Sequence, residues 1–157
     1  MFFRRLLPII CLVVLAASPA AGQRNPVTPA KDDKCPVCGM PVTIYPDIIA
    51  EIIFKDGTYA AFDGAKDMFR YYLNMKKYNP SKSINDIDSI YVHEYYDLKF
   101  IDGRKAYYIM GSDVHGPMGR ELIPLRTEED AEAFRYDHKG TILRFEDVTE
   151  AVVKALK

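Results

Sequence analysis

A hairpin signal occurs twice in this 157-residue chain and limits the folds open to it. Asp-Gly at 56–57 separates two short apolar segments, 48–54 and 58–62, of which the first is rich in isoleucine. A second Asp-Gly, at 102–103, precedes another such segment at 105–110. Asp-Gly between short apolar runs is typical of tight turns that join antiparallel strands. The chain is therefore expected to build antiparallel sheets from hairpins.

Helical patterns alternate with these strand signals. Apolar residues recur at helical spacing between 68 and 75, and Asp63 stands at the expected N-cap, which predicts a helix over 63–77. Thr127, followed by three acidic residues, predicts the start of a helix that Gly140 ends. The other predicted elements are strands at 90–96, 121–125 and 141–145 and a helix at 148–156. The expected fold class is α+β, with two tandem strand-strand-helix (ββαβ-like) units over about 35–80 and 90–157.

The first residues have the pattern of a secretory signal peptide. Two arginines precede an apolar run of 12 residues, short of the roughly 20 that span a bilayer, and small residues follow. We predict a signal peptide at 1–22, a flexible tether at 23–34 that is poor in large apolar residues, and the folded domain at 35–157. Cys11 is not preceded by the small residues of a lipid-modified cysteine. A periplasmic protein without a lipid anchor or stable membrane insertion is expected.

Charge and motifs exclude several classes of function. The chain has 21 Lys+Arg against 22 Asp+Glu, and the basic residues form no stripe of the kind that binds a phosphate backbone, so nucleic acid is not an expected partner. No Ser/His/Asp arrangement, paired-carboxylate motif or Gly-rich phosphate loop stands out. A binding protein is expected rather than an enzyme.

The chemistry begins at Cys-Pro-Val-Cys-Gly-Met, residues 35–40. Cys35 and Cys38 can reach one ion, and Met40 adds a thioether two positions later. Thiolate and thioether ligands suit Cu(I), whereas structural Zn(II) sites normally have four Cys or His donors. The segment is therefore a candidate Cu(I) site.

Two residues in the Gly/Pro-rich segment 111–119 are further candidates. Met118 has no periodic reason to occur among turn residues, so it is either a ligand or a loop anchor that packs on the core. His115 lies three positions earlier and is either an additional Cu(I) ligand or a solvated loop histidine. The sequence leaves both pairs of alternatives open.

A disulfide or a redox-active pair is the main alternative for the cysteines. Redox-active CxxC motifs usually open a helix, whose N-terminus lowers the thiol pKa. Here the motif leads to Met-Pro-Val-Thr, an extended pattern, with Pro46 close behind. This favours metal binding over redox catalysis.

Several segments together resemble the NosL-type accessory proteins of nitrous oxide reductase, a family of exported copper(I) chaperones. They are the cysteine motif, Phe62-Asp63, Gly111–Val114 with Gly116–Gly119, Ala131–Phe134, and His138–Gly140, in family order. The resemblance covers about residues 35–145. It implies two related ββαβ-type units, similar to a domain of organomercurial lyase, and sulfur ligands from the cysteine motif and Met118. Many members are lipid-anchored at a cysteine that ends the signal peptide, and this chain lacks one.

Four functions compete on this basis: a Cu(I) chaperone, a thiol-disulfide oxidoreductase, a zinc- or heavy-metal-binding module, and a carbon-mercury lyase. A lyase needs a further reactive cysteine, and only Cys35 and Cys38 follow the signal peptide. The chaperone is the leading hypothesis. Its expected partner is an apo multicopper reductase, in the first place nitrous oxide reductase, or another cuproprotein as metal acceptor; a homodimer is left open.

Overall fold

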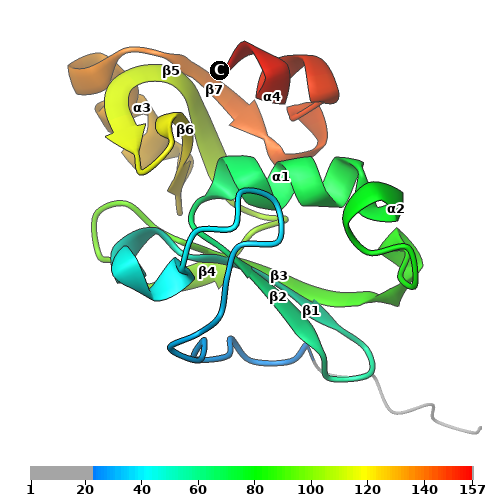
Figure 1. Ribbon diagram of the computed structural model, residues 1–157. Helices are drawn as coiled ribbons and strands as arrows, with labels where there is room; N and C mark the ends of the chain where they lie inside the picture. Colours follow the sequence, from blue (N-terminus) through cyan, green and yellow to red (C-terminus); the bar gives the residue numbers. More distant parts are fainter. Residues whose placement is uncertain (1–22, 157) are drawn as a thin grey trace, which may run out of the picture.

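The computed structural model describes residues 23–156, and the predicted signal peptide with Cys11 lies outside them. Two antiparallel sheets form the molecule (Figure 1). The first has the strand order β2-β1-β3-β4 and the second β6-β5-β7. The strands are β1 (Ala50–Phe54), β2 (Tyr59–Phe62), β3 (Ile87–His93), β4 (Phe100–Asp102), β5 (Tyr107–Gly116), β6 (Gly119–Leu125) and β7 (Thr141–Arg144). The α+β class with antiparallel sheets is confirmed.

Helix α1 (Ala65–Leu73) lies between the two sheets, as Figure 1 shows. It breaks at Asn74, and the single turn α2 (Met75–Tyr78) continues the chain, so the helix predicted over 63–77 is two helices. Helix α3 (Glu128–His138) packs on the second sheet, and α4 (Glu150–Ala155) packs on α1. Among residues 23–156, no helix is long and apolar enough to cross a membrane.

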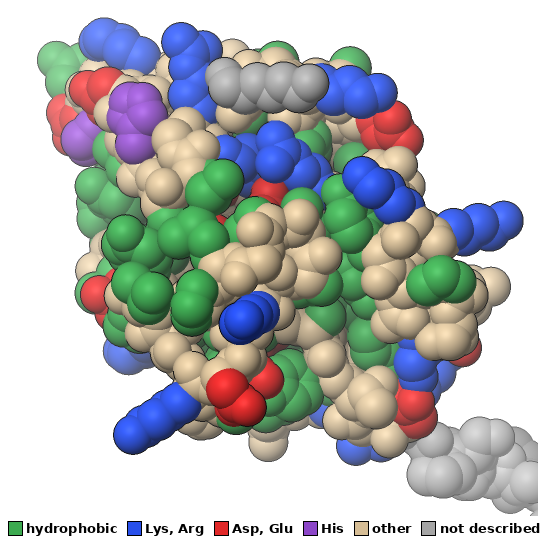
Figure 2. Space-filling view, viewed as in Figure 1, with side chains coloured by type: hydrophobic (Ala, Val, Ile, Leu, Met, Phe, Trp, Pro, Cys, Tyr) green, Lys and Arg blue, Asp and Glu red, His purple; other side chains and the backbone are tan. Residues whose placement is uncertain are grey.

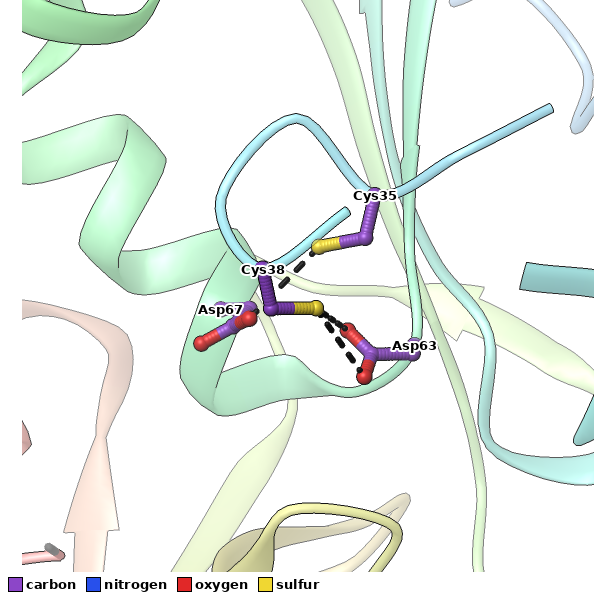
Figure 3. A group of neighbouring side chains, drawn as sticks. All are labelled: Cys35, Cys38, Asp63 and Asp67. Carbon is purple, nitrogen blue, oxygen red and sulfur yellow. Dashed lines mark hydrogen bonds between the residues drawn. The ribbon is translucent and has the colours of Figure 1, made fainter. Parts of the chain in front are cut away.

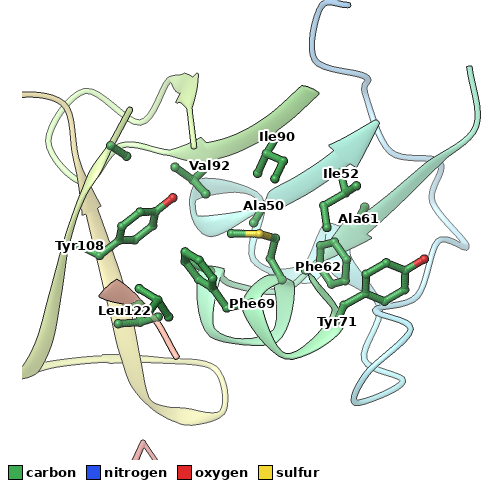
Figure 4. Close-up of a cluster of buried hydrophobic side chains, with 14 of the residues drawn as sticks. Ala50, Ile52, Ala61, Phe62, Phe69, Tyr71, Ile90, Val92, Tyr108 and Leu122 are labelled. Atoms are coloured by element: carbon green, nitrogen blue, oxygen red, sulfur yellow. The ribbon is translucent and has the colours of Figure 1, made fainter. Parts of the chain in front are cut away.

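The main core lies on both sides of α1 (Figure 4). Phe69 is fully buried, and its ring contacts Tyr108 of β5 at a centroid distance of 5.0 Å and Phe145 at 4.9 Å. On the other side, Phe62 meets Tyr71 edge to face at 5.2 Å. Because one helix supplies aromatic rings to both sheets, the two halves share the main core, while a second, smaller cluster lies between the second sheet and α3.

The second Asp-Gly does not form the predicted hairpin. β4 pairs with β3, and β5 pairs with β6 and β7, so 102–103 connects the two sheets. Gly103 is needed for close approach, because a Cβ there would lie 2.8 Å from Ile90 Cγ2. The strands expected to open the second unit thus belong to the first sheet. The turn at 56–57 does join β1 to β2, with Gly57 at φ 88°.

The segment predicted to be a free tether lies against the first sheet. The Arg24 backbone N–H donates to Asp88 Oδ2 at 2.8 Å, and the Tyr91 hydroxyl donates to the Arg24 carbonyl at 2.6 Å. The Val27 N–H donates to Glu51 Oε2 at 3.0 Å. These contacts are polar and lead to residues far along the chain, so the segment's low apolar content did not reveal them.

Glu51 gives this contact a pH dependence. Burial raises the pKa of Glu51 to about 7, although the Val27 N–H opposes the shift. A carboxyl whose folded pKa lies above its unfolded value destabilises the fold as pH rises from about 4.5 through 7. Glu51→Gln removes the charge and keeps an acceptor oxygen. We expect the free energy of unfolding of the variant to exceed that of the parent by on the order of 1 kcal/mol at pH 8 and by little at pH 4.5. Urea denaturation at the two pH values measures the difference.

The exposed Glu146→Gln provides the matched control, because it makes the same change outside the sheet. An equal gain for both variants at pH 8 would contradict the assignment to Glu51.

Candidate metal centre

The cysteine motif forms a closed loop in front of α1 (Figure 1). The Cys35 N–H donates to the Met40 carbonyl at 2.8 Å, and the Gly39 N–H donates to the Cys35 carbonyl at 2.8 Å. Gly39 has φ 81°, a left-handed conformation that glycine adopts without strain. This backbone closure turns Cys35 and Cys38 toward the same point, as Figure 3 shows.

Two carboxylates meet the sulfurs there. Asp63 follows β2, and Asp67 lies in the first turn of α1. Cys35 Sγ donates to Asp67 Oδ2 at 3.5 Å, and Cys38 Sγ donates to Asp63 Oδ1 and Oδ2 at 3.3 and 3.4 Å (Figure 3). One ligand atom from each of the four residues lies within 4.8 Å of the others. The site thus has two soft and two hard donors.

Both cysteines are free thiols in this structure. Cys35 is 1% exposed, and burial raises its pKa far above the ordinary value. Burial also raises the pKa of the half-buried Cys38 to about 11, and the neighbouring carboxylates contribute in the same direction. A redox-active CxxC needs a lowered thiol pKa, so these surroundings disfavour the oxidoreductase hypothesis. A bound cation would reverse the effect by stabilising both thiolates.

Asp63 and Asp67 are the site residues that the sequence analysis missed. Asp63 was predicted to cap the helix, but the N-cap is Gly64, and the Asp63 side chain faces Cys38 instead. The available signal was two aspartates four positions apart at the predicted helix start, although Asp63 lies before the helix and helical spacing does not bring it to Asp67. Asp67 is also held by Arg70, whose Nη1 lies 3.0 Å from Asp67 Oδ1.

Met118 lies at the tip of the β5–β6 hairpin and is 47% exposed. The buried Lys66 of α1 holds this tip, because its Nζ donates to the carbonyls of Met118 at 3.0 Å and Arg120 at 2.6 Å. Lys66 precedes Asp67 in the sequence, so the same turn of α1 holds the hairpin tip and supplies a carboxylate to the cysteine cluster. A loop anchor would pack its side chain on the core, and the exposed Met118 side chain does not.

Glu121 completes this junction. It is 6% exposed, and its Oε1 accepts hydrogen bonds from the backbone N–H of Lys66 at 2.6 Å and of Leu122 at 2.9 Å. Glu121, 55 positions from Lys66, therefore accepts a hydrogen bond from a free backbone N–H at the start of α1. This is the role predicted for Asp63. Burial raises the pKa of Glu121 to about 7.

The other two sequence candidates are less closely joined to the sulfurs. His115 lies outside the four-residue cluster and is exposed, and its Nδ1 is 2.9 Å from the Asp113 carbonyl. Met40 is half-buried beside the cysteine loop. The structure brings together Cys35 and Cys38, while the ligand roles of Met40, His115 and Met118 remain predictions.

Comparison with known proteins gives a consistent result. The NosL family model matches residues 26–153. The copper-binding lipoprotein NosL of Stutzerimonas stutzeri is 31% identical over 138 residues, which cover 83% of this chain and 69% of that protein. The crystal structure of the copper chaperone NosL from Shewanella denitrificans matches with a TM-score of 0.70 at 25% identity, over 83% of this chain and 99% of that one. By name these relatives are binding proteins and chaperones, not enzymes.

Proposed function

This chain belongs to the NosL family, and on that premise we propose that it is an exported Cu(I) chaperone that delivers the ion to an apo multicopper enzyme, nitrous oxide reductase in the first place. The observation that carries the proposal is the convergence of the Cys35 and Cys38 sulfurs on a loop at the surface of α1. Copper is the cargo of such a protein. The relatives' names support copper, and the sulfur donors support its reduced state.

Loading requires both thiols to lose their protons, because thiolates bind the metal. Each thiol already donates to a carboxylate, Cys35 to Asp67 and Cys38 to Asp63. The carboxylates thus lie where they accept the released protons. The protons then pass from the carboxylates to solvent water, so that in the loaded state both carboxylates are negative again and stabilise the bound cation.

Zinc is the specific competitor. Two cysteine sulfurs and two carboxylate oxygens within 4.8 Å are a donor set that tetrahedral Zn(II) also accepts. The cysteine motif alone offers zinc only two of the four donors it needs, and Asp63 with Asp67 supply two more. The metal preference therefore decides between the leading function and a zinc-binding module.

An anaerobic competition titration tests this preference. The reduced protein is titrated with Cu(I) against a Cu(I) chelator, in the presence and absence of excess Zn(II). We expect one Cu(I) per chain, at an affinity that zinc does not change. Displacement of Cu(I) by stoichiometric Zn(II) would overturn the copper function.

Met118 is proposed as a further Cu(I) ligand, which the β5–β6 hairpin would supply to the cysteine loop. Met118→Leu keeps similar volume and apolarity, and such swaps usually cost less than about 1.5 kcal/mol of stability. We expect the variant to fold normally and to bind Cu(I) at least about 10-fold more weakly, by the same competition titration. Parental affinity in the folded variant would exclude the ligand role.

Met40 and His115 are proposed as auxiliary, replaceable ligands. His115 is exposed on the same hairpin as Met118, so a small movement of the tip moves both. An incoming acceptor ligand can then enter before the original ligands leave, as transfer requires.

Delivery is distinguished from storage by its kinetics. We expect Cu(I) transfer to an apo multicopper acceptor to accelerate with acceptor concentration and to exceed loss to a chelator that cannot dock. A transfer rate equal to spontaneous release would indicate a buffering protein. Export through residues 1–22 to the periplasm, without a lipid at Cys11, is part of the proposal, and the mass of the mature protein tests it.

A further inference from the structure

A small cleft lies between the start of α1 and the two sheets, and none of Cys35, Cys38, Asp63 and Asp67 lines it. Its volume is about 170 Å³, and its walls are largely apolar, with Ile48, Ala65, Tyr95, Val114, Leu122 and Ile123 among the residues that line it. Pockets for drug-sized ligands or cofactors occupy about 300–1,000 Å³. This cleft has the size for one extended side chain.

Glu121 presents an unused acceptor to the cleft. Its Oε1 binds two backbone N–H groups, but Oε2 accepts no hydrogen bond from residues 23–156. Oε2 faces two cleft-lining glycines, because a Cβ on Gly64 or Gly116 would lie 2.5 or 3.1 Å from it. Oε2 keeps some accessible surface, so a cationic donor that enters the cleft can reach it and form a charge-assisted hydrogen bond.

The other polar groups of the cleft favour the same kind of ligand. The ionisable residues that line it are Asp47, Glu121 and two histidines, with no lysine or arginine. The charge of Lys66 acts on the Glu121 carboxylate, but Lys66 makes no hydrogen bond to Oε2, because its Nζ donates to two carbonyls of the hairpin. His93 contributes a buried Nδ1 without a hydrogen-bond partner among the described residues, an acceptor in the tautomer protonated on Nε2.

We propose that this cleft binds the lysine or arginine side chain of a protein partner. The alkyl stem would lie along the apolar walls, and the cationic head would donate to Glu121 Oε2. The inference does not depend on which metal the neighbouring site holds.

The surface around the cleft favours a protein, rather than a free amine, as the ligand. Ile44 and Leu98 are exposed, and a shallower pocket formed by 44–48 and 115–117 adjoins the cleft through Ile48 and His115. Figure 2 shows hydrophobic side chains gathered on this side of the molecule. A free amine would leave this apolar rim in water, whereas a protein surface would cover it around one buried cationic anchor.

Chemical-shift titration of the ¹⁵N-labelled protein tests the proposal with three probes. They are Ac-Leu-Lys-Leu-NH₂, the same peptide with norleucine for lysine, and n-butylammonium. We expect saturable shifts at Gly64, Gly116 and Glu121 with the lysine peptide, at least 10-fold weaker binding of the norleucine peptide, and weaker binding of butylammonium. Equal affinity of the two peptides would overturn the cationic anchor, and butylammonium as tight as the lysine peptide would overturn the protein partner.

Two variants locate the binding. Glu121→Gln removes the charge, and we expect at least a 10-fold loss of affinity for the lysine peptide. Because Glu121 also accepts a hydrogen bond from the backbone at the start of α1, Gly116→Ala gives a second test: its methyl group would lie 3.1 Å from Oε2 and narrow the cleft there, and circular dichroism checks that the variant folds. The matched control is Glu128→Gln on the exposed side of α3. Loss of affinity in the control, or parental affinity in folded Gly116→Ala, would contradict the site.

Discussion

Serine at both Cys35 and Cys38 is expected to lower the affinity for Cu(I) by more than about 100-fold, because residues that merely support a metal ligand already contribute 10–100-fold. Serine is close in size to cysteine and keeps a hydroxyl that can donate to Asp63 or Asp67, so the loop is expected to stay closed. Anaerobic competition against a Cu(I) chelator measures the effect.

Two further measurements complete this experiment. The single variants Cys35→Ser and Cys38→Ser are titrated in the same way, and circular dichroism checks that all variants fold. Each single variant is expected to retain part of the affinity, since one thiolate and the proposed Met118 thioether remain. Cu(I) bound by the double variant as tightly as by the parent would place the metal elsewhere in the chain and would remove the observation on which the function rests.

Alanine at Phe69 is expected to lower the free energy of unfolding by about 3–5 kcal/mol, the usual cost of truncating a buried phenylalanine. Phe69 is fully buried and contacts Tyr108 at 5.0 Å and Phe145 at 4.9 Å, so its removal leaves a cavity where α1 joins the second sheet. Urea denaturation followed by circular dichroism measures the loss.

Tyr136→Ala is the matched control, because Tyr136 is an aromatic residue on α3 that is 81% exposed. We expect it to change stability by less than about 0.5 kcal/mol. Similar losses for the two variants would show that the Phe69 contacts do not join the two halves as the structure indicates.

Local chemistry explains which elements the sequence predicted correctly. The turn at 56–57 joins β1 to β2, and Thr127 caps α3 by accepting a hydrogen bond from the Asp130 N–H at 3.1 Å. Both depend on neighbours within a few residues. Asp-Gly at 102–103 has the same local signal, but the flanking strands β4 and β5 pair with β3 and with β6 and β7, and the segment becomes a connection between sheets.

The sequence by itself determined the α+β class and the pair of soft donors in the cysteine motif, because turn residues and closely spaced donors act over short distances along the chain. Only the tertiary structure decided what surrounds the sulfurs. Asp63 and Asp67 reach them when β2 and α1 pack beside the loop, and Lys66 with Glu121 fixes the Met118 hairpin across more than 50 residues of chain. Such contacts depend on how the two sheets close on α1, and no local pattern of residues encodes that closure.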